Sequence, residues 1–344
     1  MEDALPDFTP GRPLRAYDRH GQFRDFSTDQ LVGLRLNQFK DWVCAAGTAN
    51  LQINMDGDIF GASCRVGGKL GNIFEQFSVP KNWVTCPMAA CSCGADLFIP
   101  KVKTPTLQPL LRKTAGLGPS ARHNPTSRAE IVALERTHAA NSKQVFWEIG
   151  RRCNFDCSYC WPWIHNNHQK HRTLAELITA TEKLETEFIR GEKINFIISG
   201  GEPTVNPAFL EWMQYLSQFG HHLSLHSNGS RQPDYYRELI RLGDLNLSVH
   251  FEFWNRQKFL AVVSAVTEEK AVRRNKDIGH LEVKIMMTPG RRQEVLDLEA
   301  ELRKIKHFQD YCTWAIVPVR EGQKGDLIME GYDETDFALF GDRA

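Results

Sequence analysis

Three cysteines placed within eight residues constrain this 344-residue chain more than any other feature. The segment RRCNFDCSYC (151–160) holds Cys153, Cys157 and Cys160 at the spacing C-x3-C-x2-C. A closed zinc site takes four protein ligands, and a disulfide framework takes an even number of cysteines. Three thiolates therefore indicate a metal centre with one coordination position left free. A zinc site completed by a histidine of HNNHQKH (165–171) is the alternative.

Net charge and the number of cysteines limit which classes of protein this chain can belong to. Lys+Arg and Asp+Glu both number 42, so no global field draws the chain to nucleic acid or membrane. The first residues carry no apolar signal core, and no run approaches the roughly 18–20 apolar residues of a membrane-spanning helix. We therefore expect a cytoplasmic, reducing location with no membrane partner. There, an odd total of nine cysteines favours metal binding over disulfides.

Hydrophobic periodicity predicts the architecture. From residue 143 to about 320, short apolar runs alternate with amphipathic segments, giving six expected strands and five intervening helices. One helix is expected over 172–191, opened by a capping box of Thr173 and Glu176. This alternation predicts a parallel α/β fold, and periodicity alone does not separate a doubly wound sheet from an incomplete barrel.

The motifs after the cysteines resemble those of the radical S-adenosylmethionine (SAM) enzymes. In that family an aromatic residue precedes the last cysteine, and Tyr159 stands there. SGGEP (199–203) ends the next expected strand and resembles the family's glycine-rich SAM-binding motif. HSNG (226–229) ends the following strand, as the family's polar strand end does. The resemblance covers roughly residues 144–320 and implies a partial (β/α)6 TIM-type barrel, with its site at the carboxyl ends of the strands.

The resemblance also implies the chemistry. A [4Fe–4S] cluster on the three cysteines would bind the amino and carboxylate groups of SAM at its open iron. One electron, from a reductant such as flavodoxin or ferredoxin, would cleave SAM to methionine and a 5′-deoxyadenosyl radical. That radical would abstract hydrogen from a substrate carbon. The residues expected to contact SAM are Tyr159, Gly200, Gly201, Glu202, Pro203, Ser227 and Asn228.

The next expected strand adds two candidates. His250 and Glu252 alternate along it with Ser248, so the three side chains would share one face. They could touch SAM or substrate, or be satisfied polar groups of the interior.

A second cysteine group occupies the segment 1–101. Its members are Cys44, Cys64, Cys86, Cys91 and Cys93, placed around a β-hairpin expected at the Asp56-Gly57 turn. A helix is expected before it, over 28–43. The pattern resembles the opening of the SPASM domain, an auxiliary iron–sulfur module of many radical SAM enzymes. Here the module is N-terminal and has five cysteines where the family has seven. The interval from Gly57 to Cys64 is also longer than expected.

Five thiols are enough for one auxiliary [4Fe–4S] cluster, and a four-cysteine zinc site is the alternative. The segment 102–142 is expected to be a basic, proline-containing linker, and 321–344 a C-terminal tail.

The expected function is that of a radical SAM oxidoreductase or modifying enzyme with one auxiliary cluster. A peptide, a protein or a small molecule is the first substrate class. A rearrangement or modification of a nucleotide or nucleic-acid base is the second, weakly favoured by the basic linker. A zinc-binding module without enzymatic activity is the alternative of another class.

Overall fold

The computed structural model describes residues 14–26, 28–91, 94–109, 111, 129–136, 143–160, 166–274, 276, 278–321 and 327–343. The chain divides into two units that exchange short segments. The first unit is Met1–Ile53, Asp58–Val145 and Leu184–Glu192, and the second is Asn54–Gly57, Phe146–Lys183 and Lys193–Ala344. The predicted domain boundaries remain predictions.

The elements up to residue 136 are β1 (Leu14–Tyr17), β2 (Phe23–Phe26), α1 (Thr28–Gly33), β3 (Val43–Cys44), β4 (Asn50–Ile53), β5 (Asp58–Phe60), β6 (Lys69–Asn72), β7 (Val84–Thr85), α2 (Gly94–Leu97), β8 (Lys101–Val102), η1 (Pro105–Leu107) and β9 (Ala133–Arg136). Those from residue 144 onward are β10 (Gln144–Glu148), α4 (Leu174–Leu184), η2 (Glu185–Ile189), β11 (Asn195–Ser199), η3 (Pro203–Val205), α5 (Phe209–Ser217), β12 (His222–Ser227), α6 (Pro233–Leu242), β13 (Asp244–His250), α7 (Arg256–Val272), β14 (Leu281–Met287), α8 (Arg292–Leu302), α9 (Phe308–Tyr311), β15 (Cys312–Pro318), β16 (Arg320–Glu321), β17 (Leu327–Ile328), α10 (Glu334–Phe337) and β18 (Gly341–Arg343).

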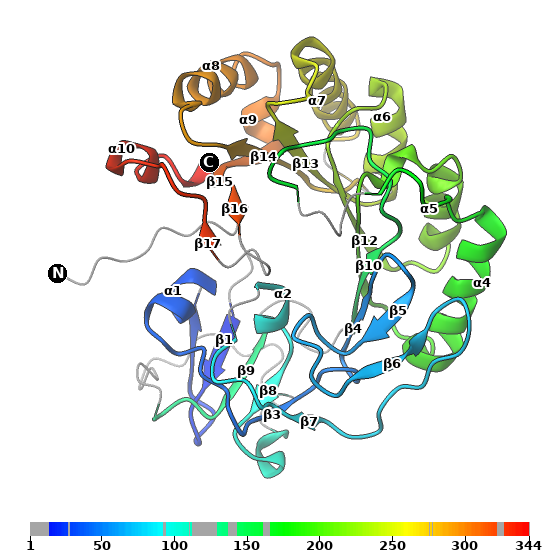
Figure 1. Ribbon diagram of the computed structural model, residues 1–344, viewed down its shortest axis with the longest axis vertical. Coiled ribbons are helices and arrows are strands. Elements are labelled where there is room, and N and C mark those ends of the chain that lie inside the picture. Colours follow the sequence, from blue (N-terminus) through cyan, green and yellow to red (C-terminus); the bar gives the residue numbers. More distant parts are fainter. Residues whose placement is uncertain are drawn as a thin grey trace. The chain divides into compact units, whose positions relative to one another are not determined.

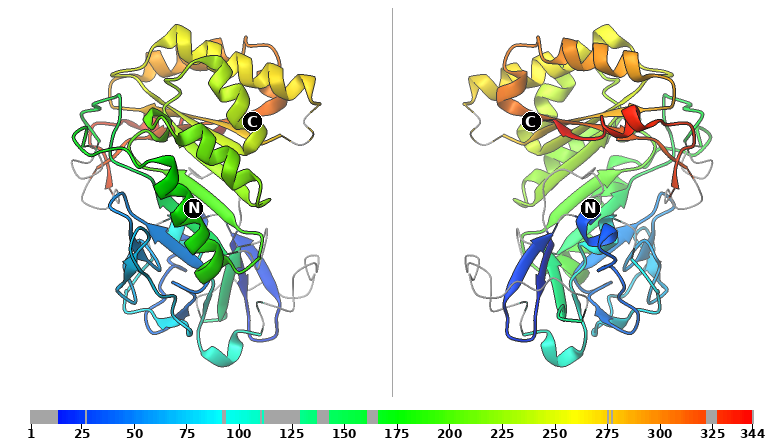
Figure 2. Two further views of the ribbon diagram at one scale, coloured as in Figure 1. Left: turned by 90° about the vertical axis from the view of Figure 1, so that its right-hand side faces the viewer. Right: turned by 90° about the vertical axis from the view of Figure 1, so that its left-hand side faces the viewer.

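The second unit is built on a mainly parallel sheet. Strands β10 to β15 lie side by side in chain order, and the pairs from β11 to β15 are parallel. Strand β18 pairs antiparallel with β15 at the edge. Helices α5 to α8 connect successive strands and lie on one face of the sheet (Figures 1 and 2). The predicted α/β class with a parallel sheet is confirmed. The described strands form no closed sheet, so the partial barrel remains a prediction.

Alternation along the strands gives this sheet one apolar and one polar face. In β13, Leu245, Leu247 and Val249 are buried, while Asn246, Ser248 and His250 are partly exposed. The apolar face packs against helices, as in the edge-to-face contact of Trp147 with Trp212 at 5.1 Å. The opposite face therefore carries the polar side chains that lead up to the candidate site.

The first unit is antiparallel. One sheet has the order β2-β1-β9-β8-β3-β7, and β4, β5 and β6 form an antiparallel meander. The helix expected over 28–43 is wrong beyond its first turns, because α1 ends at Gly33. Arg35 takes a left-handed conformation with φ 54°, and Leu36 N donates back to Leu31 O, which closes the helix early.

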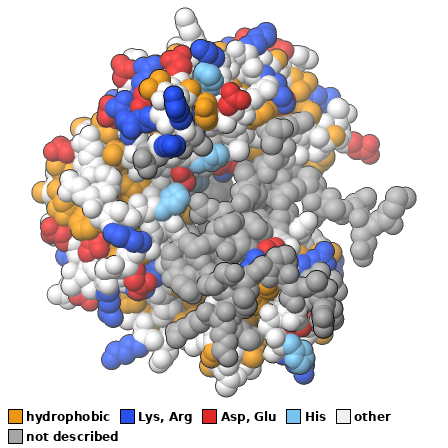
Figure 3. All heavy atoms as spheres, turned by 180° about the vertical axis from the view of Figure 1, so that it is seen from behind, with side chains coloured by type: hydrophobic (Ala, Val, Ile, Leu, Met, Phe, Trp, Pro, Cys, Tyr) orange, Lys and Arg blue, Asp and Glu red, His pale blue; other side chains and the backbone are white. Residues whose placement is uncertain are grey.

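Charges of both signs are interspersed on the surface. Figure 3 shows basic and acidic side chains close together on one face. The helices of the second unit carry ion pairs such as Arg237 with Glu268 and Arg241 with Glu269. Within the described residues, we find no helix with the length and apolar character to cross a bilayer.

Thr181 on α4 provides a test of this packing. Its fully buried hydroxyl accepts from Trp212 Nε1 (3.1 Å) and donates to Leu177 O (2.8 Å). Thr181→Val would leave the indole N–H without a partner, so we expect a loss of about 1–3 kcal/mol in the free energy of unfolding. Urea denaturation measures it. Thr179→Val, on the exposed face of the same helix, is the control. Equal midpoints for the two variants would contradict the prediction.

Candidate functional site

A buried carboxylate joins the ends of two strands. Glu202, in the turn after β11, is 3% exposed. Its Oε1 accepts from Thr204 N (3.1 Å), Thr204 Oγ1 (2.6 Å) and Ser227 Oγ (2.9 Å), and its Oε2 accepts from Asn228 N (2.6 Å). Burial raises the pKa of Glu202, and these hydrogen bonds oppose that by favouring the charged form. Glu202 therefore fixes the end of β12 against the turn after β11.

Asn228 extends this connection to the cysteine loop, residues 151–160. Its side-chain amide donates to Asn154 Oδ1 at 3.0 Å and lies 3.9 Å from Cys153 Sγ. The main chain makes a second connection, since Glu202 N donates to Arg152 O at 2.8 Å. The cysteine loop, the SGGEP turn and the HSNG strand end thus meet at one place, although 75 residues separate Cys153 from Asn228.

The two glycines of the SGGEP turn have a steric role. A Cβ on Gly200, whose φ is +131°, would lie 2.5 Å from Gly150 O. A Cβ on Gly201 would lie 2.4 Å from Arg152 O. Both distances are too short for non-bonded atoms. Only glycine therefore lets this turn pack against the backbone that enters the cysteine loop. Pro203, which is buried, begins η3 directly after the turn.

The far end of the cysteine loop is held by β13 and the turn after it. Glu252 accepts from Ser158 N (2.6 Å) and from Ser158 Oγ (2.5 Å). The Tyr159 hydroxyl bonds to His250 Nδ1 at 2.9 Å. Three of the residues expected to contact SAM therefore make contacts within this region. Glu252 and His250 hold the cysteine loop, and Tyr159 is the loop residue that His250 holds.

His250 is held as a neutral imidazole. Burial lowers its pKa to about 4, although the neighbouring charge of Glu252 opposes this. Ser248 Oγ donates to Ser227 O at 3.4 Å and lies 2.9 Å from His250 Nε2, so it accepts the Nε2 proton. His250 Nδ1 is then the acceptor, and Tyr159 donates to it. This network orients Tyr159 beside Cys157.

The three thiols of the cysteine loop are partly buried and lie within electrostatic range of one another. Burial raises the pKa of Cys153 to about 11 and that of Cys157 to about 12. No three described His, Cys, Asp or Glu side chains converge closely enough to hold a single metal ion. Three thiols on one short loop are a soft donor set, and such donors fit an iron–sulfur cluster.

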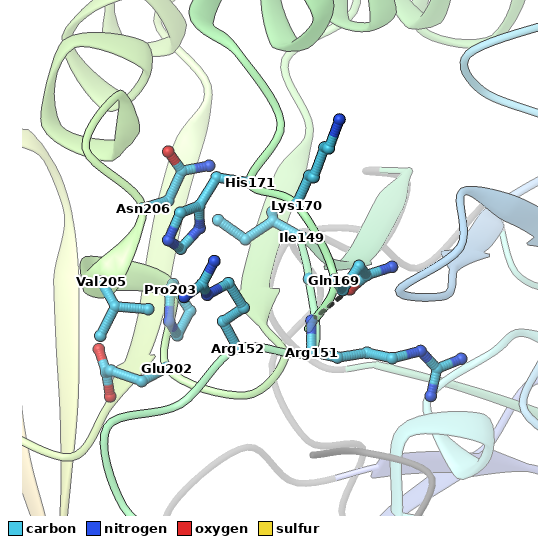
Figure 4. Close-up of a pocket in the computed structure, with 11 residues that line it drawn as sticks. Ile149, Arg151, Arg152, Gln169, Lys170, His171, Glu202, Pro203, Val205 and Asn206 are labelled. Atoms are coloured by element: carbon cyan, nitrogen blue, oxygen red, sulfur yellow. Dashed lines mark hydrogen bonds between the residues drawn. The ribbon is translucent and has the colours of Figure 1, made fainter. Parts of the chain in front are cut away.

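A small open pocket lies at the base of the loop. Figure 4 shows Arg152 directed toward His171, while Arg151 extends away from the pocket.

Arg151 pairs with Asp56 at 2.6 Å, and its main-chain N–H donates to Gln169 Oε1 at 2.8 Å. Burial lowers the pKa of His171, and the Arg152 charge adds to this effect. These contacts anchor the start of the loop.

The first unit brings thiols together from separate elements. Cys44 ends β3, Cys86 follows β7, and both are buried. Cys64 lies in the loop after β5 and is within electrostatic range of both. Cys91 packs, with Cys86, against one hydrophobic cluster. Cys93 lies outside the described residues.

The Cys64 loop is fixed by a buried carboxylate. Asp96 is 3% exposed and accepts from Ser63 N (2.8 Å) and Cys64 N (2.9 Å). Burial raises the pKa of Cys64 to about 11. The described thiols of this unit are soft donors of the kind that both zinc and iron–sulfur clusters take.

Several residues that hold this site escaped prediction. The most important are Thr204, Asn154, Ser158, Asp56, Gln169 and Asp96. Thr204 alone had a local signal, because a hydroxyl two residues after a turn carboxylate commonly bonds to it. The others act across long sequence separations.

Residues 147–310 match the family model described as the Radical SAM superfamily. The GTP 3′,8-cyclase of Haemophilus ducreyi is 28% identical over 168 residues, which are 45% of this chain and 47% of that protein. The GTP 3′,8-cyclase of Peptoclostridium acidaminophilum is 28% identical over 129 residues, 35% and 38% of the two chains. The chain thus spans less than half the length of these curated relatives.

Among solved structures, the crystal structure of Streptococcus suis SuiB bound to precursor peptide SuiA aligns with a TM-score of 0.41. The sequences are 12% identical, and the alignment covers 66% of this chain and 54% of that one. The family match and the two cyclases confirm the prediction of an enzyme. The alternative of a zinc-binding module without activity is therefore set aside.

Glu202→Gln tests the central carboxylate. A glutamine has one acceptor oxygen, so its amide would face either Asn228 N or the Thr204 and Ser227 donors. We expect a loss of about 1–3 kcal/mol in the free energy of unfolding. Urea denaturation measures it, with Glu211→Gln on the exposed face of α5 as the control. A variant as stable as wild type would contradict this role of Glu202.

The raised pKa of Glu148 predicts that the stability of the fold depends on pH. Burial at the end of β10 raises its pKa from 4.5 to about 7, although Arg151 opposes this. The folded chain thus holds a proton that the unfolded chain releases, so the free energy of unfolding falls as the pH rises from 4.5 to about 7. Glu148→Gln should make this fall smaller, because only the contribution of the other buried carboxyls is left, and be more stable at pH 8 by about 1–3 kcal/mol. Urea denaturation across this range checks it. An unchanged slope would contradict the prediction.

Proposed function

Residues 147–310 form a radical SAM domain, as the motifs predict, and from this we propose that the protein cleaves SAM reductively and abstracts hydrogen from a substrate carbon. The observation that supports the proposal most is the network around Glu202. It ties the SGGEP turn, the end of β12 and the cysteine loop together at the carboxyl ends of parallel strands. Ligands of α/β folds bind at these ends.

Cys153, Cys157 and Cys160 would hold a [4Fe–4S] cluster. When bound, the cluster and SAM supply one electron and a 5′-deoxyadenosyl radical, with methionine as the other product. Phe155 stacks on Phe253 beside the loop, and this pair would restrict access of water. The sheet is proposed to act as a partial (β/α)6 barrel around the substrate.

The residues expected to contact SAM divide into two roles. Ser227 is 4% exposed and its hydroxyl is shared between Glu202 and Tyr236, so we assign Ser227 and Glu202 to positioning. We assign contact with SAM to the main chain of Gly200 and Gly201 and to the side-chain amide of Asn228, which lies beside Cys153. His250 and Glu252 position the loop through Tyr159 and Ser158.

An auxiliary [4Fe–4S] cluster is proposed in the first unit. Its ligands would come from Cys44, Cys64, Cys86 and Cys91, with Cys93 as the fifth thiol. The mutual proximity of the first three supports a shared metal centre. A flavodoxin or ferredoxin would supply electrons.

Two substrate classes follow. A peptide, protein or small molecule is the first. The two GTP 3′,8-cyclases that match this chain support the second, a nucleotide modified or cyclised by the same radical.

The test uses full-length protein reconstituted without oxygen, then given dithionite and SAM. We expect about eight irons per chain, four for each cluster, and formation of 5′-deoxyadenosine. Cys157→Ala should abolish 5′-deoxyadenosine, while Cys312→Ala, a buried cysteine on β15 outside the site, should not. Wild-type protein that holds iron yet forms none, or equal rates for both variants, would overturn the proposal. Faster formation on adding GTP would favour the nucleotide class, and an unchanged rate would favour the first.

A further inference from the structure

The first unit contains a buried lysine next to its thiols. Lys101 is 2% exposed, a rare state for this residue type. It lies on β8, where it is the direct antiparallel partner of Cys44 on β3. Cys44 is 3% exposed and carries the thiol nearest in register to this side chain.

The hydrogen bonds of Lys101 show its charge state. Its Nζ donates to the main-chain carbonyls of Asp96 (2.5 Å), Ile99 (2.8 Å) and Leu97 (3.5 Å). Three acceptors require three N–H donors, which only the ammonium form has. Nζ also lies 5.3 Å from the centre of the Phe39 ring. Lys101 is therefore a buried cation.

This cation forms no ion pair with any carboxylate among the described residues. The nearby Asp96 carboxylate is occupied by Ser63 N and Cys64 N, and only its carbonyl receives Lys101. Buried charges are normally paired, because neutral carbonyls do not replace the loss of water around an ion. Among the described residues, Lys101 therefore has no carboxylate as a counter-charge.

The thiols are placed to supply such a counter-charge. Lys101 faces Cys44 across the β3–β8 pair, and its charge is within electrostatic range of the Cys44 thiol. Cys64 and Cys86 lie within electrostatic range of Cys44, and Cys86 belongs to the core that includes Phe39. Four thiolates around a [4Fe–4S] core give a net negative group, which a fixed ammonium would stabilise.

We propose that Lys101 is the buried counter-charge of the auxiliary cluster and raises its reduction potential. This inference rests on the proposed auxiliary cluster. On reduction the cluster gains one electron from the reductant, and no covalent bond of the protein forms or breaks. A positive charge in a low-dielectric interior stabilises the added electron, and the negative charge of Asp96 opposes it. Lys101 would thus act on the cluster through its charge and would not bind iron.

A purely structural role is the competing explanation. Lys101 Nζ closes the last carbonyls of α2, as a lysine at a helix end commonly does. Removal of such a cap would loosen the fold without a defined effect on potential. Lys101 and Asp96 carry opposite charges, and this separates the two explanations. If charge matters, loss of Lys101 should lower the reduction potential of the cluster and loss of the Asp96 charge should raise it.

The experiment uses the full chain carrying Cys153→Ala, Cys157→Ala and Cys160→Ala, so that remaining iron belongs to the first unit. Iron is counted, and the reduced fraction is followed by electron paramagnetic resonance during a dithionite titration. We expect Lys101→Met to lower the reduced-to-oxidised ratio at a fixed potential at least tenfold, or about 59 mV for one electron. Asp96→Asn should raise that ratio. Lys103→Met, exposed two residues further on, is the control and should leave it unchanged.

The outcomes separate the two proposals. About four irons with equal ratios for Lys101→Met and Lys103→Met would overturn the role of Lys101 and leave the cluster standing. A triple-alanine chain without iron would overturn the auxiliary cluster and this inference together. If Lys101→Met holds no iron, Lys101→Arg decides: iron retained with an unchanged ratio supports the charge, and iron lost in both variants overturns it.

Discussion

The hydrogen bonds to the Glu202 carboxylate are the interaction on which the site depends. One side chain satisfies donors from its own turn and from the end of β12, and Asn228 passes this constraint to Cys153. The glycines beside it remove the side chains that would keep the turn from the cysteine loop. A buried carboxyl group at the centre of the site is tolerated because its two oxygens accept four hydrogen bonds.

The two units place their thiols by different means. In the second unit, one loop carries three cysteines, and contacts from β13 and the turn Asn54–Gly57 hold its two ends. In the first unit, the thiols come from separate elements, and two buried charged residues, Asp96 and Lys101, stand among them. The first arrangement keeps one side of the loop accessible. In the second, Cys44 and Cys86 are buried, Cys91 is partly buried and Cys64 is exposed.

Local patterns predicted the second unit well. The capping box of Thr173 and Glu176 is present at the start of α4, with Thr173 N donating to Glu176 at 2.8 Å. The strand and helix order follows the alternation of apolar runs. The sequence could not reveal that Asp56 would pair with Arg151, 95 residues away, because no local pattern encodes such a contact. It also failed at residues 34–43, where Arg35 turns the chain out of the expected helix.

The most direct test of the shared site is hyperfine spectroscopy on the reduced protein with SAM labelled by ¹⁵N in its amino group. The cysteine loop, the SGGEP turn and Asn228 are held together, so the proposed cluster and the amino group of SAM would lie beside each other there. A coupling between the ¹⁵N nucleus and the reduced cluster is the predicted result. A fully reduced cluster that shows no such coupling at saturating SAM would contradict the assignment of these three segments to one site.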